Sequence, residues 1–431
     1  MELVRWVATP LAATIDAKTA LAVETVPSGS VRLRLARGAD LMKNYGDWQM
    51  AIYVNGLSGE RPELPMTFGE LERSAAATMP EAIWSYVAGG AGDERTQNAN
   101  VSAFDRWGVM PRMLAGAQQR DLSVDLFGTQ LPTPLMLAPI GVIGICDPDG
   151  HGDLLTARAA AVTGVPMIAS TLTQDPMEQV AAELGETPGW FQLYPPHDGE
   201  LEESFVHRAE AAGFSAIVVT LDTLSLGWRP RDLAIASFPQ LRGLCLANYM
   251  SDPVFRAKLT TPPEEDPQGA AAVWAALFGN PGLNWDDLAR LRSLTRLPML
   301  LKGICHPDDA RRAVDAGVDG IYCSTHGGRQ ANGGLAALEC LPDVVDAVGP
   351  DVPVVFDSGV RSGPDVLKAL ALGASAVAIG RPYAYGLAVG GQAGIEHVLH
   401  CLLAEMDLTM AIDGYPRVSE LTREALRRIG A

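Results

Sequence analysis

The sequence predicts an α/β protein built as a (β/α)8 barrel, and three observations support this fold. Eight apolar runs of strand length occur along the chain, and segments rich in alanine and charge separate most of them. Continuous apolar strands that alternate with helices are typical of a parallel sheet covered on its outer face, and eight such units close into a barrel. A doubly wound open sheet is the alternative, but no Gly-x-Gly-x-x-Gly motif follows the first strand.

The first part of the chain differs from the rest. Residues 1–45 show no sustained periodicity, so we expect an extension, either mobile or created by a start site placed upstream of Met42. Helical spacing of apolar residues predicts helices across residues 67–89, with Pro80 in the first turn of the second helix. The predicted catalytic domain then spans residues 46–431.

The barrel strands follow in order, with one long interruption. The predicted strands are 135–140, 165–170, 190–194, 216–222, 298–303, 320–324, 352–357 and 374–380. The interruption, residues 228–285, follows the fourth strand and contains several prolines and the acidic patch 264–266. Long loops in compact domains are usually functional, and barrel enzymes place their sites at the C-terminal ends of strands. We therefore predict a lid with mobile parts over the active-site mouth.

Composition and charge narrow the classes of function. The formal net charge of −18 argues against a nucleic-acid partner, and no apolar run reaches the roughly 18 residues that a membrane helix needs. The six cysteines form no Cys-x-x-Cys pair and the histidines no ligand cluster, so we expect no metal and interpret His151 as a loop residue. Free thiols and the lack of a secretory signal favour the cytoplasm.

Polar side chains stand at the C-terminal ends of the predicted strands, where a barrel brings them into one cavity. Each alone could be a cap or turn residue, but together they predict an active site. His326 can take a proton near neutral pH, and Arg329, two glycines further on, can hold a carboxylate through paired hydrogen bonds. The set is Ser170, Gln192, Tyr194, Thr220, Asp222, Lys302, Ser324, His326, Asp357 and Arg381.

The last two strands end in glycine-containing segments, residues 357–361 and 380–382. Barrels often bind phosphate there through backbone N–H groups and a helix N-terminus, and Arg381 adds a guanidinium, so we predict a phosphorylated ligand. The alternative is a structural turn with a surface arginine. Lys302 ends the fifth strand, and a buried ammonium needs an anion such as a reduced flavin supplies. A Schiff-base lysine is the competing interpretation.

From about residue 46 onward, the chain resembles the FMN-dependent α-hydroxy acid dehydrogenase/oxidase family. The motifs that carry this resemblance are 138–141, 191–194, 220–223, 301–304, 326–330, 357–361 and 380–382. Residues 86–94, 227–232 and 241–246, with the long lid, are similar to the lactate 2-monooxygenase subgroup. Thr325 and segments 195–197 and 224–226 depart from that pattern, and we expect them beside the substrate.

The resemblance implies FMN as the cofactor and assigns residues to its parts. Backbone near flavin N5 would come from Pro139, Ile140 and Gly141. Hydrogen bonds to the isoalloxazine and ribityl groups would come from Ser170, Gln192, Thr220 and Ser324. The ribityl chain and phosphate would be held by Asp357, Gly359, Arg361, Gly380 and Arg381. Lys302 would stabilise the negative charge of the reduced flavin.

The resemblance also implies a reaction. His326 would be the base, with Asp222 stabilising its imidazolium, and Lys302 and Tyr194 complete the expected catalytic group. Substrate carboxylate binding would fall to Tyr86, Tyr194, Arg229 and Arg329. A small L-2-hydroxy acid, first of all L-lactate, would be oxidised with O2.

Three outcomes follow from this site. Oxidative decarboxylation would turn lactate into acetate, carbon dioxide and water. An oxidase or dehydrogenase would instead release the keto acid, with peroxide where O2 is the acceptor. A barrel that binds a phosphorylated ligand without redox chemistry is the alternative from another class. Relatives imply a homo-oligomer, a tetramer or an octamer.

Overall fold

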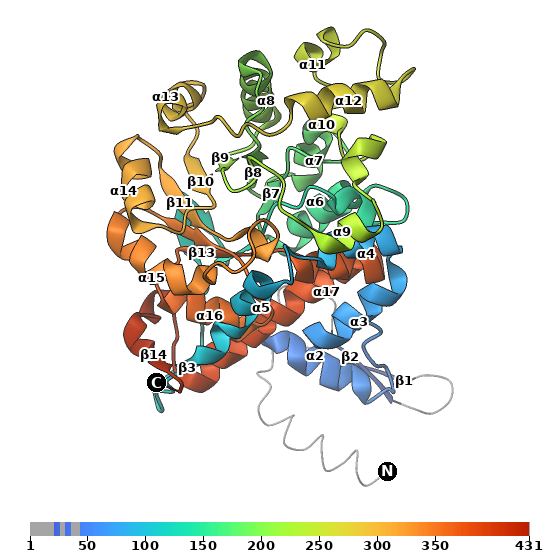
Figure 1. The fold of residues 1–431 in the computed structure, drawn as a ribbon. Helices are drawn as coiled ribbons and strands as arrows, with labels where there is room; N and C mark the ends of the chain where they lie inside the picture. The colour runs from blue at the N-terminus through green and yellow to red at the C-terminus, as the bar shows by residue number, and fades with distance from the viewer. Residues whose placement is uncertain (1–20, 26–30, 36–43, 431) are drawn as a thin grey trace. The chain divides into compact units, whose positions relative to one another are not determined.

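The computed structural model describes residues 21–25, 31–35 and 44–430 (Figure 1). The chain divides into two compact units, residues 1–63 and 64–431. The described residues of the first unit form an antiparallel pair of strands, which the sequence did not predict, and a helix. These elements are β1 (Leu21–Thr25), β2 (Val31–Leu35) and α2 (Asp47–Gly56). The predicted extension falls mostly outside the described residues, so its mobility and the 45/46 domain boundary stay predictions.

A closed barrel of eight parallel strands forms the centre of the second unit (Figure 1). The strands follow one another in chain order, and the last pairs with the first, so the predicted (β/α)8 fold is confirmed. All strand residues are buried, because helices cover the outer face and side chains fill the interior. The strands are β6 (Leu135–Leu137), β7 (Met167–Ala169), β8 (Gly189–Leu193), β9 (Ile217–Thr220), β10 (Met299–Lys302), β11 (Gly320–Cys323), β12 (Val354–Phe356) and β13 (Ala376–Ile379).

A hairpin closes one end of the barrel. It consists of β4 (Val124–Leu126) and β5 (Thr129–Leu131), and its Leu126 and Leu131 belong to the same buried cluster as the barrel's interior side chains. Phe127 at its turn lies against Gly320, the first residue of β11. The hairpin therefore covers the N-terminal ends of the strands, and the C-terminal ends remain available for a site.

Helices surround the barrel, one after each strand. They are α6 (Gly152–Thr163), α7 (Met177–Leu184), α8 (Gly199–Ala212), α13 (Trp285–Ser293), α14 (Pro307–Asp315), α15 (Ala337–Val348), α16 (Gly363–Ala371) and α17 (Arg381–Asp413). The last of these is interrupted at Gly390 and Gly391, whose backbone is not helical. No helix among the described residues is both long enough and apolar enough to cross a membrane.

Two helices lie where the periodicity predicts them, α3 (Phe68–Thr78) and α4 (Glu81–Ala88), and a third, α5 (Arg95–Ser102), follows them without having been predicted. Thr67 begins the first by accepting a hydrogen bond from the Glu70 N–H. Pro80 is the N-cap of α4 rather than a residue of its first turn, which corrects the prediction by one position. A small antiparallel pair, β3 (Trp107–Val109) and β14 (Leu426–Arg428), joins this region to the C-terminal segment.

The predicted interruption after the fourth strand is helical rather than irregular. The described chain between β9 and β10 contains no strand; before α13 it forms α9 (Pro230–Ala234), the 3-10 helix η4 (Pro239–Arg242), α10 (Ala247–Met250), α11 (Pro253–Ala257) and α12 (Pro267–Leu277). Ion pairs fix part of it to α8, with Lys258 Nζ 2.5 Å from Asp198 and Arg208 3.0 Å from Asp252. Its movement as a lid stays a prediction.

Candidate active site

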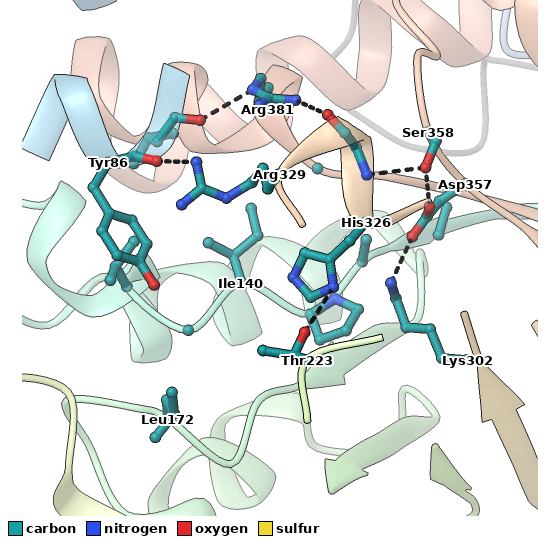
Figure 2. Close-up of a pocket in the computed structure, with 18 of the residues that line it drawn as sticks. Tyr86, Ile140, Leu172, Thr223, Lys302, His326, Arg329, Asp357, Ser358 and Arg381 are labelled. Atoms are coloured by element: carbon teal, nitrogen blue, oxygen red, sulfur yellow. Dashed lines mark hydrogen bonds and ion pairs between the residues drawn. The ribbon is translucent and has the colours of Figure 1, made fainter. Parts of the chain in front are cut away.

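A cavity lies at the C-terminal ends of the strands, and most of the predicted site residues line it (Figure 2). The predicted residues on its wall are Tyr86, Pro139, Ile140, Gly141, Tyr194, Arg229, Lys302, His326, Arg329, Asp357, Gly359, Arg361, Gly380 and Arg381. Five predicted residues do not line it: Ser170, Gln192, Thr220, Asp222 and Ser324. The barrel thus gathers side chains from segments far apart in sequence into one site.

The expected base, His326, is held by a carboxylate. It follows β11 in a 3-10 turn, η5 (His326–Gly328), and its backbone has a φ of 55°, which non-glycine residues adopt rarely and often at functional sites. Its Nδ1 lies 2.8 Å from Asp222 Oδ1, just beyond β9. Thr223 Oγ1 lies 3.3 Å from the same Nδ1 and donates to Asp222 Oδ1 at 3.2 Å (Figure 2). With Nδ1 engaged, Nε2 is the nitrogen left to accept a proton.

The surroundings set the charges of this pair. Burial lowers the pKa of His326, and the opposing charge of Asp222 does not restore it to its usual value. Burial raises the pKa of the Asp222 carboxyl, but the charges of His326 and Lys302 outweigh burial and hold that pKa below its ordinary value. At neutral pH the pair is therefore a neutral imidazole beside a carboxylate, which is the state a general base requires.

Two arginines form the expected carboxylate clamp. Arg329 Nη1 donates to the carbonyl oxygens of Tyr86 and Gly89, at 2.6 Å for Gly89, while its buried Nη2 has no partner among the residues that the structure describes. Arg229 Nε donates to the Arg329 carbonyl at 3.1 Å, and both guanidinium groups lie over the Tyr86 ring. Burial and the charge of Arg229 lower the pKa of Arg329. An anion would relieve this repulsion and use the free Nη2.

Lys302 heads a chain of hydrogen bonds. Its ammonium donates to Ser324 Oγ at 2.9 Å, and Ser324 in turn donates to Asp357 Oδ1 at 2.5 Å. Asp357 Oδ2 lies 3.4 Å from the ammonium (Figure 2). Burial lowers the pKa of Lys302, but the charges of Asp357 and Asp222 outweigh it and the pKa lies above its ordinary value. A permanent positive charge is thus fixed at the cavity wall.

Ser324 also connects this chain to the base. Its Oγ accepts a hydrogen bond from the His326 N–H at 2.9 Å, so one hydroxyl serves Lys302, Asp357 and the His326 backbone. We predicted Ser324 as a direct FMN contact. The structure gives its hydroxyl three protein partners and places it off the cavity wall, so direct contact stays a prediction.

The expected phosphate end lies where α17 begins. Gly380 is the N-cap of this helix and has open space where a Cβ would stand, with Ile140 Cδ1 as the nearest atom at 4.0 Å. Gly359 has a φ of 93°, and a Cβ there would collide with the Asn100 carbonyl. Burial and the charge of Arg361 lower the pKa of Arg381. A helix N-terminus beside two guanidinium groups is suited to a phosphate.

Buried polar atoms test whether FMN fits this cavity. Gln192 Oε1 accepts from Ser170 Oγ at 3.0 Å, which fixes the amide, while Gln192 Nε2 and Thr220 Oγ1 have no partner within the described part of the chain. Unpaired buried polar groups are costly, and the edge of an isoalloxazine carries both donors and acceptors. With the cationic phosphate end and Lys302, the residues present fit FMN.

Several residues of the site are not apparent from the sequence. Thr223 directly follows Asp222 within the motif 220–223, and this adjacency is a signal that could identify it. Phe238 and Phe278 line the cavity from the interruption after β9, where no periodic pattern marks them. Ser358 donates to Asp357 at 2.7 Å and accepts from the Thr325 N–H at 3.2 Å.

Two of the segments expected beside the substrate lie elsewhere. Thr325 is absent from the cavity wall because its hydroxyl pairs with the buried side chain of Asn100, at 2.9 Å from the amide nitrogen. Residues 195–197 also do not line the cavity, whereas Leu226 does. Within the described residues no group of histidine, cysteine and acidic side chains could hold a metal. His151 instead precedes α6 and contacts Asp175 at 2.8 Å.

Comparisons with known proteins agree with the geometry. The family model for FMN-dependent dehydrogenase matches residues 75–428. An FMN-dependent alpha-hydroxy acid dehydrogenase of Penicillium citrinum is 42% identical over 390 residues, which cover 90% of this chain and 96% of that protein. An L-lactate oxidase of Lysinibacillus sphaericus is 41% identical over 370 residues, covering 86% and 94%. A structure of mandelate oxidase with (S)-2-phenylpropionate has a TM-score of 0.74 at 36% identity and covers 85% and 98%.

The chain therefore belongs to the FMN-dependent α-hydroxy acid dehydrogenase/oxidase family. It is an FMN-dependent oxidoreductase that oxidises α-hydroxy acids, and FMN is its cofactor. Membership of this family decides against the non-redox alternative.

Proposed function

We propose that this protein oxidises L-lactate and related L-2-hydroxy acids with O2 as the electron acceptor. The observation that carries this proposal is the juxtaposition of a neutral base with a carboxylate clamp. His326 is held 2.8 Å from Asp222, and the buried Nη2 of Arg329, which lines the same cavity, has no partner among the described residues. Two relatives are named for lactate or mandelate, which are both 2-hydroxy acids.

The side chains divide the work of the oxidation. Arg329 and Arg229 bind the substrate carboxylate and fix the orientation of C2. His326 takes a proton from the substrate on Nε2, and Asp222 stabilises the imidazolium that results. Bound FMN would supply the acceptor for the two electrons that leave C2, with O2 as the final oxidant and hydrogen peroxide as its product. Lys302 keeps a positive charge in place to attract the negative charge that the acceptor gains.

For the fate of the keto acid we propose oxidative decarboxylation. Peroxide that attacks the keto carbon of retained pyruvate yields acetate, carbon dioxide and water. The similarity of residues 86–94, 227–232 and 241–246 to the monooxygenase subgroup supports this outcome, and so does the insertion after β9 that lines the cavity. Such retention requires a closed site and slow product release.

Release of the keto acid is the second candidate, and the L-lactate oxidase names of relatives favour it. Aerobic turnover of 13C-labelled L-lactate separates the two. Acetate and carbon dioxide in equal amounts would support decarboxylation. Pyruvate with equimolar peroxide would instead show that the protein is an oxidase that releases the keto acid. Anaerobic L-lactate should bleach the flavin absorbance, and failure to do so would remove lactate as a substrate.

Three further features belong to the same proposal. The catalytic domain spans residues 46–431, and residues 228–285 close over the mouth of the cavity. The protein acts as a homo-oligomer, a tetramer or an octamer, in the cytoplasm. Sedimentation of the FMN-loaded protein tests the oligomer. Limited proteolysis with and without substrate tests the lid, since substrate should slow cleavage within residues 228–285.

A further inference from the structure

A second cavity of about 680 Å³ adjoins the active site. Its wall comes from the segment after β9 and from the helices α9, η4 and α12. This volume is within the range of about 300–1,000 Å³ that is typical of small-molecule sites. Most of its side chains are apolar: Leu224, Leu226, Trp228, Leu233, Ala236, Phe238, Leu241, Trp274, Ala275 and Phe278. Its charged members are Arg229, Asp232 and Arg242.

The second cavity opens from the substrate end of the first. The residues that line both cavities are Thr223, Leu226, Arg229, Phe238 and Phe278. Among them, Thr223 lies 3.3 Å from His326 Nδ1, and Arg229 belongs to the carboxylate clamp. None of the residues expected to hold FMN lines the second cavity. The junction therefore lies beside the reacting carbon rather than beside the cofactor's phosphate.

The substrate's own geometry leaves one substituent for this space. C2 of a 2-hydroxy acid carries a carboxylate, a hydroxyl, a hydrogen and a side chain. The clamp takes the carboxylate, and the base and the electron acceptor take the hydroxyl and the hydrogen between them. Only the side chain has no partner, and the apolar junction at Leu226 and Phe278 is next to it.

The wall of the second cavity is suited to an apolar ligand. Trp274 stacks between Phe278 and Phe238, with ring centroids 4.8 and 6.4 Å apart. Trp228 and Leu226 also line this cavity, and they are 72% and 54% exposed. Such surfaces are uncommon on soluble proteins unless they bind something.

We propose that the second cavity is a subsite for the side chain of a larger apolar 2-hydroxy acid, either a medium-length alkyl or an arylalkyl chain. This inference rests on the proposed 2-hydroxy acid oxidation and names the substrate class of the same site. The protein then oxidises such acids more efficiently than L-lactate, whose methyl group does not reach the second cavity.

A homologous series of substrates tests the subsite in the FMN-loaded protein. L-lactate, L-2-hydroxybutanoate, L-2-hydroxyhexanoate and L-2-hydroxyoctanoate are compared by kcat/KM. Transfer of one methylene from water to an apolar site favours binding by roughly fourfold, so kcat/KM should rise by about this factor per methylene until the cavity is full. Octanoate should also inhibit lactate oxidation more strongly than butanoate, with a lower inhibition constant. A flat or falling series would overturn the subsite.

Variants locate the effect within the protein. Ala275, on α12, lines the second cavity only, and Ala275→Trp should fill it and lower the octanoate-to-lactate ratio of kcat/KM about tenfold. Leu224→Trp provides the same test from the opposite wall. Ala276→Trp is the matched control, because Ala276 is the next residue of the same helix, is equally exposed and lines neither cavity. An unchanged ratio in both filling variants, or an equal fall in the control, would contradict the proposal.

These experiments distinguish failure of the subsite from failure of the proposed function. If lactate is oxidised but longer acids gain nothing, the proposed function stands and the subsite is wrong. If no 2-hydroxy acid reduces the flavin, the proposed function itself is wrong.

Discussion

The strand ends and the insertion after β9 line the same cavity but are built in opposite ways. At the strand ends, Lys302, Ser324 and Asp357 are almost fully buried and bonded to one another. In the insertion, the side chains of Trp228 and Leu241 expose apolar surface at the second cavity. This contrast indicates that the barrel positions the reacting groups, whereas the insertion contacts the side chain of the substrate. Variants at the strand ends should therefore affect all substrates alike, and variants in the insertion should change preference.

The largest effect is expected at the base. His326→Gln keeps a polar side chain but cannot accept the proton, so anaerobic flavin reduction should slow by about 10³–10⁴-fold. The factor should be the same for L-lactate and for L-2-hydroxyoctanoate in stopped-flow measurements. The flavin content of the variant serves as the folding control. If the loss of reduction rate differed between the two substrates, the division of roles between the strand ends and the insertion would be contradicted.

The partner of the base should give the next largest effect, together with a change in pH dependence. The pKa of His326 is already lowered, so the acid limb of the reduction rate should lie below the ordinary histidine pKa. Asp222 raises that pKa, so Asp222→Asn should move the limb to still lower pH and slow reduction roughly 100-fold, because the imidazolium loses its counter-charge. A limb that moves to higher pH would contradict the assigned roles. The control is Asp175→Asn, a buried carboxylate that lines neither cavity.

Removal of the clamp should act mainly on kcat/KM. Arg329→Met deletes the free Nη2 and should lower kcat/KM about 50-fold for every 2-hydroxy acid, since hydrogen bonds to charged groups contribute about 1.5–3 kcal/mol. Arg329→Lys retains the charge without the paired donors and should recover only part of the loss. Full activity of Arg329→Met would assign the carboxylate to another residue.

Thr223 lies at the boundary between the two regions and should give the smallest effect. Thr223→Val keeps the shape but loses the contacts with His326 Nδ1 and Asp222 Oδ1, and the reduction rate should fall about tenfold, the lower end for a hydrogen bond to a charged group. Because the residue lines both cavities, the added methyl should also raise the relative rate with L-2-hydroxyoctanoate. If the rate with L-2-hydroxyoctanoate relative to L-lactate does not change, Thr223 does not lie at the boundary between the two regions.

The strand ends were predictable because buried parallel strands appear as continuous apolar runs, and a barrel directs every strand's C-terminal end to one cavity. Thus Lys302 and Asp357 were found from their positions alone. Phe278 and the second cavity were not, because the helices of the insertion are short and packed by tertiary contacts. The pairing of Thr325 with Asn100 joins residues 225 positions apart, and no local pattern indicates it.

Arg381 has a consequence for how the active site forms. Its guanidinium donates to the carbonyl oxygens of Val87, Gly89 and Gly327, so one side chain joins segments 294, 292 and 54 residues away. Contacts of such long sequence separation form late and slowly, since the intervening chain must first be ordered. A ribosome-bound chain that ends before α17 can therefore hold most of its barrel strands and still lack a cofactor site. Catalytic competence is acquired only when the last barrel helix has been synthesised and docked.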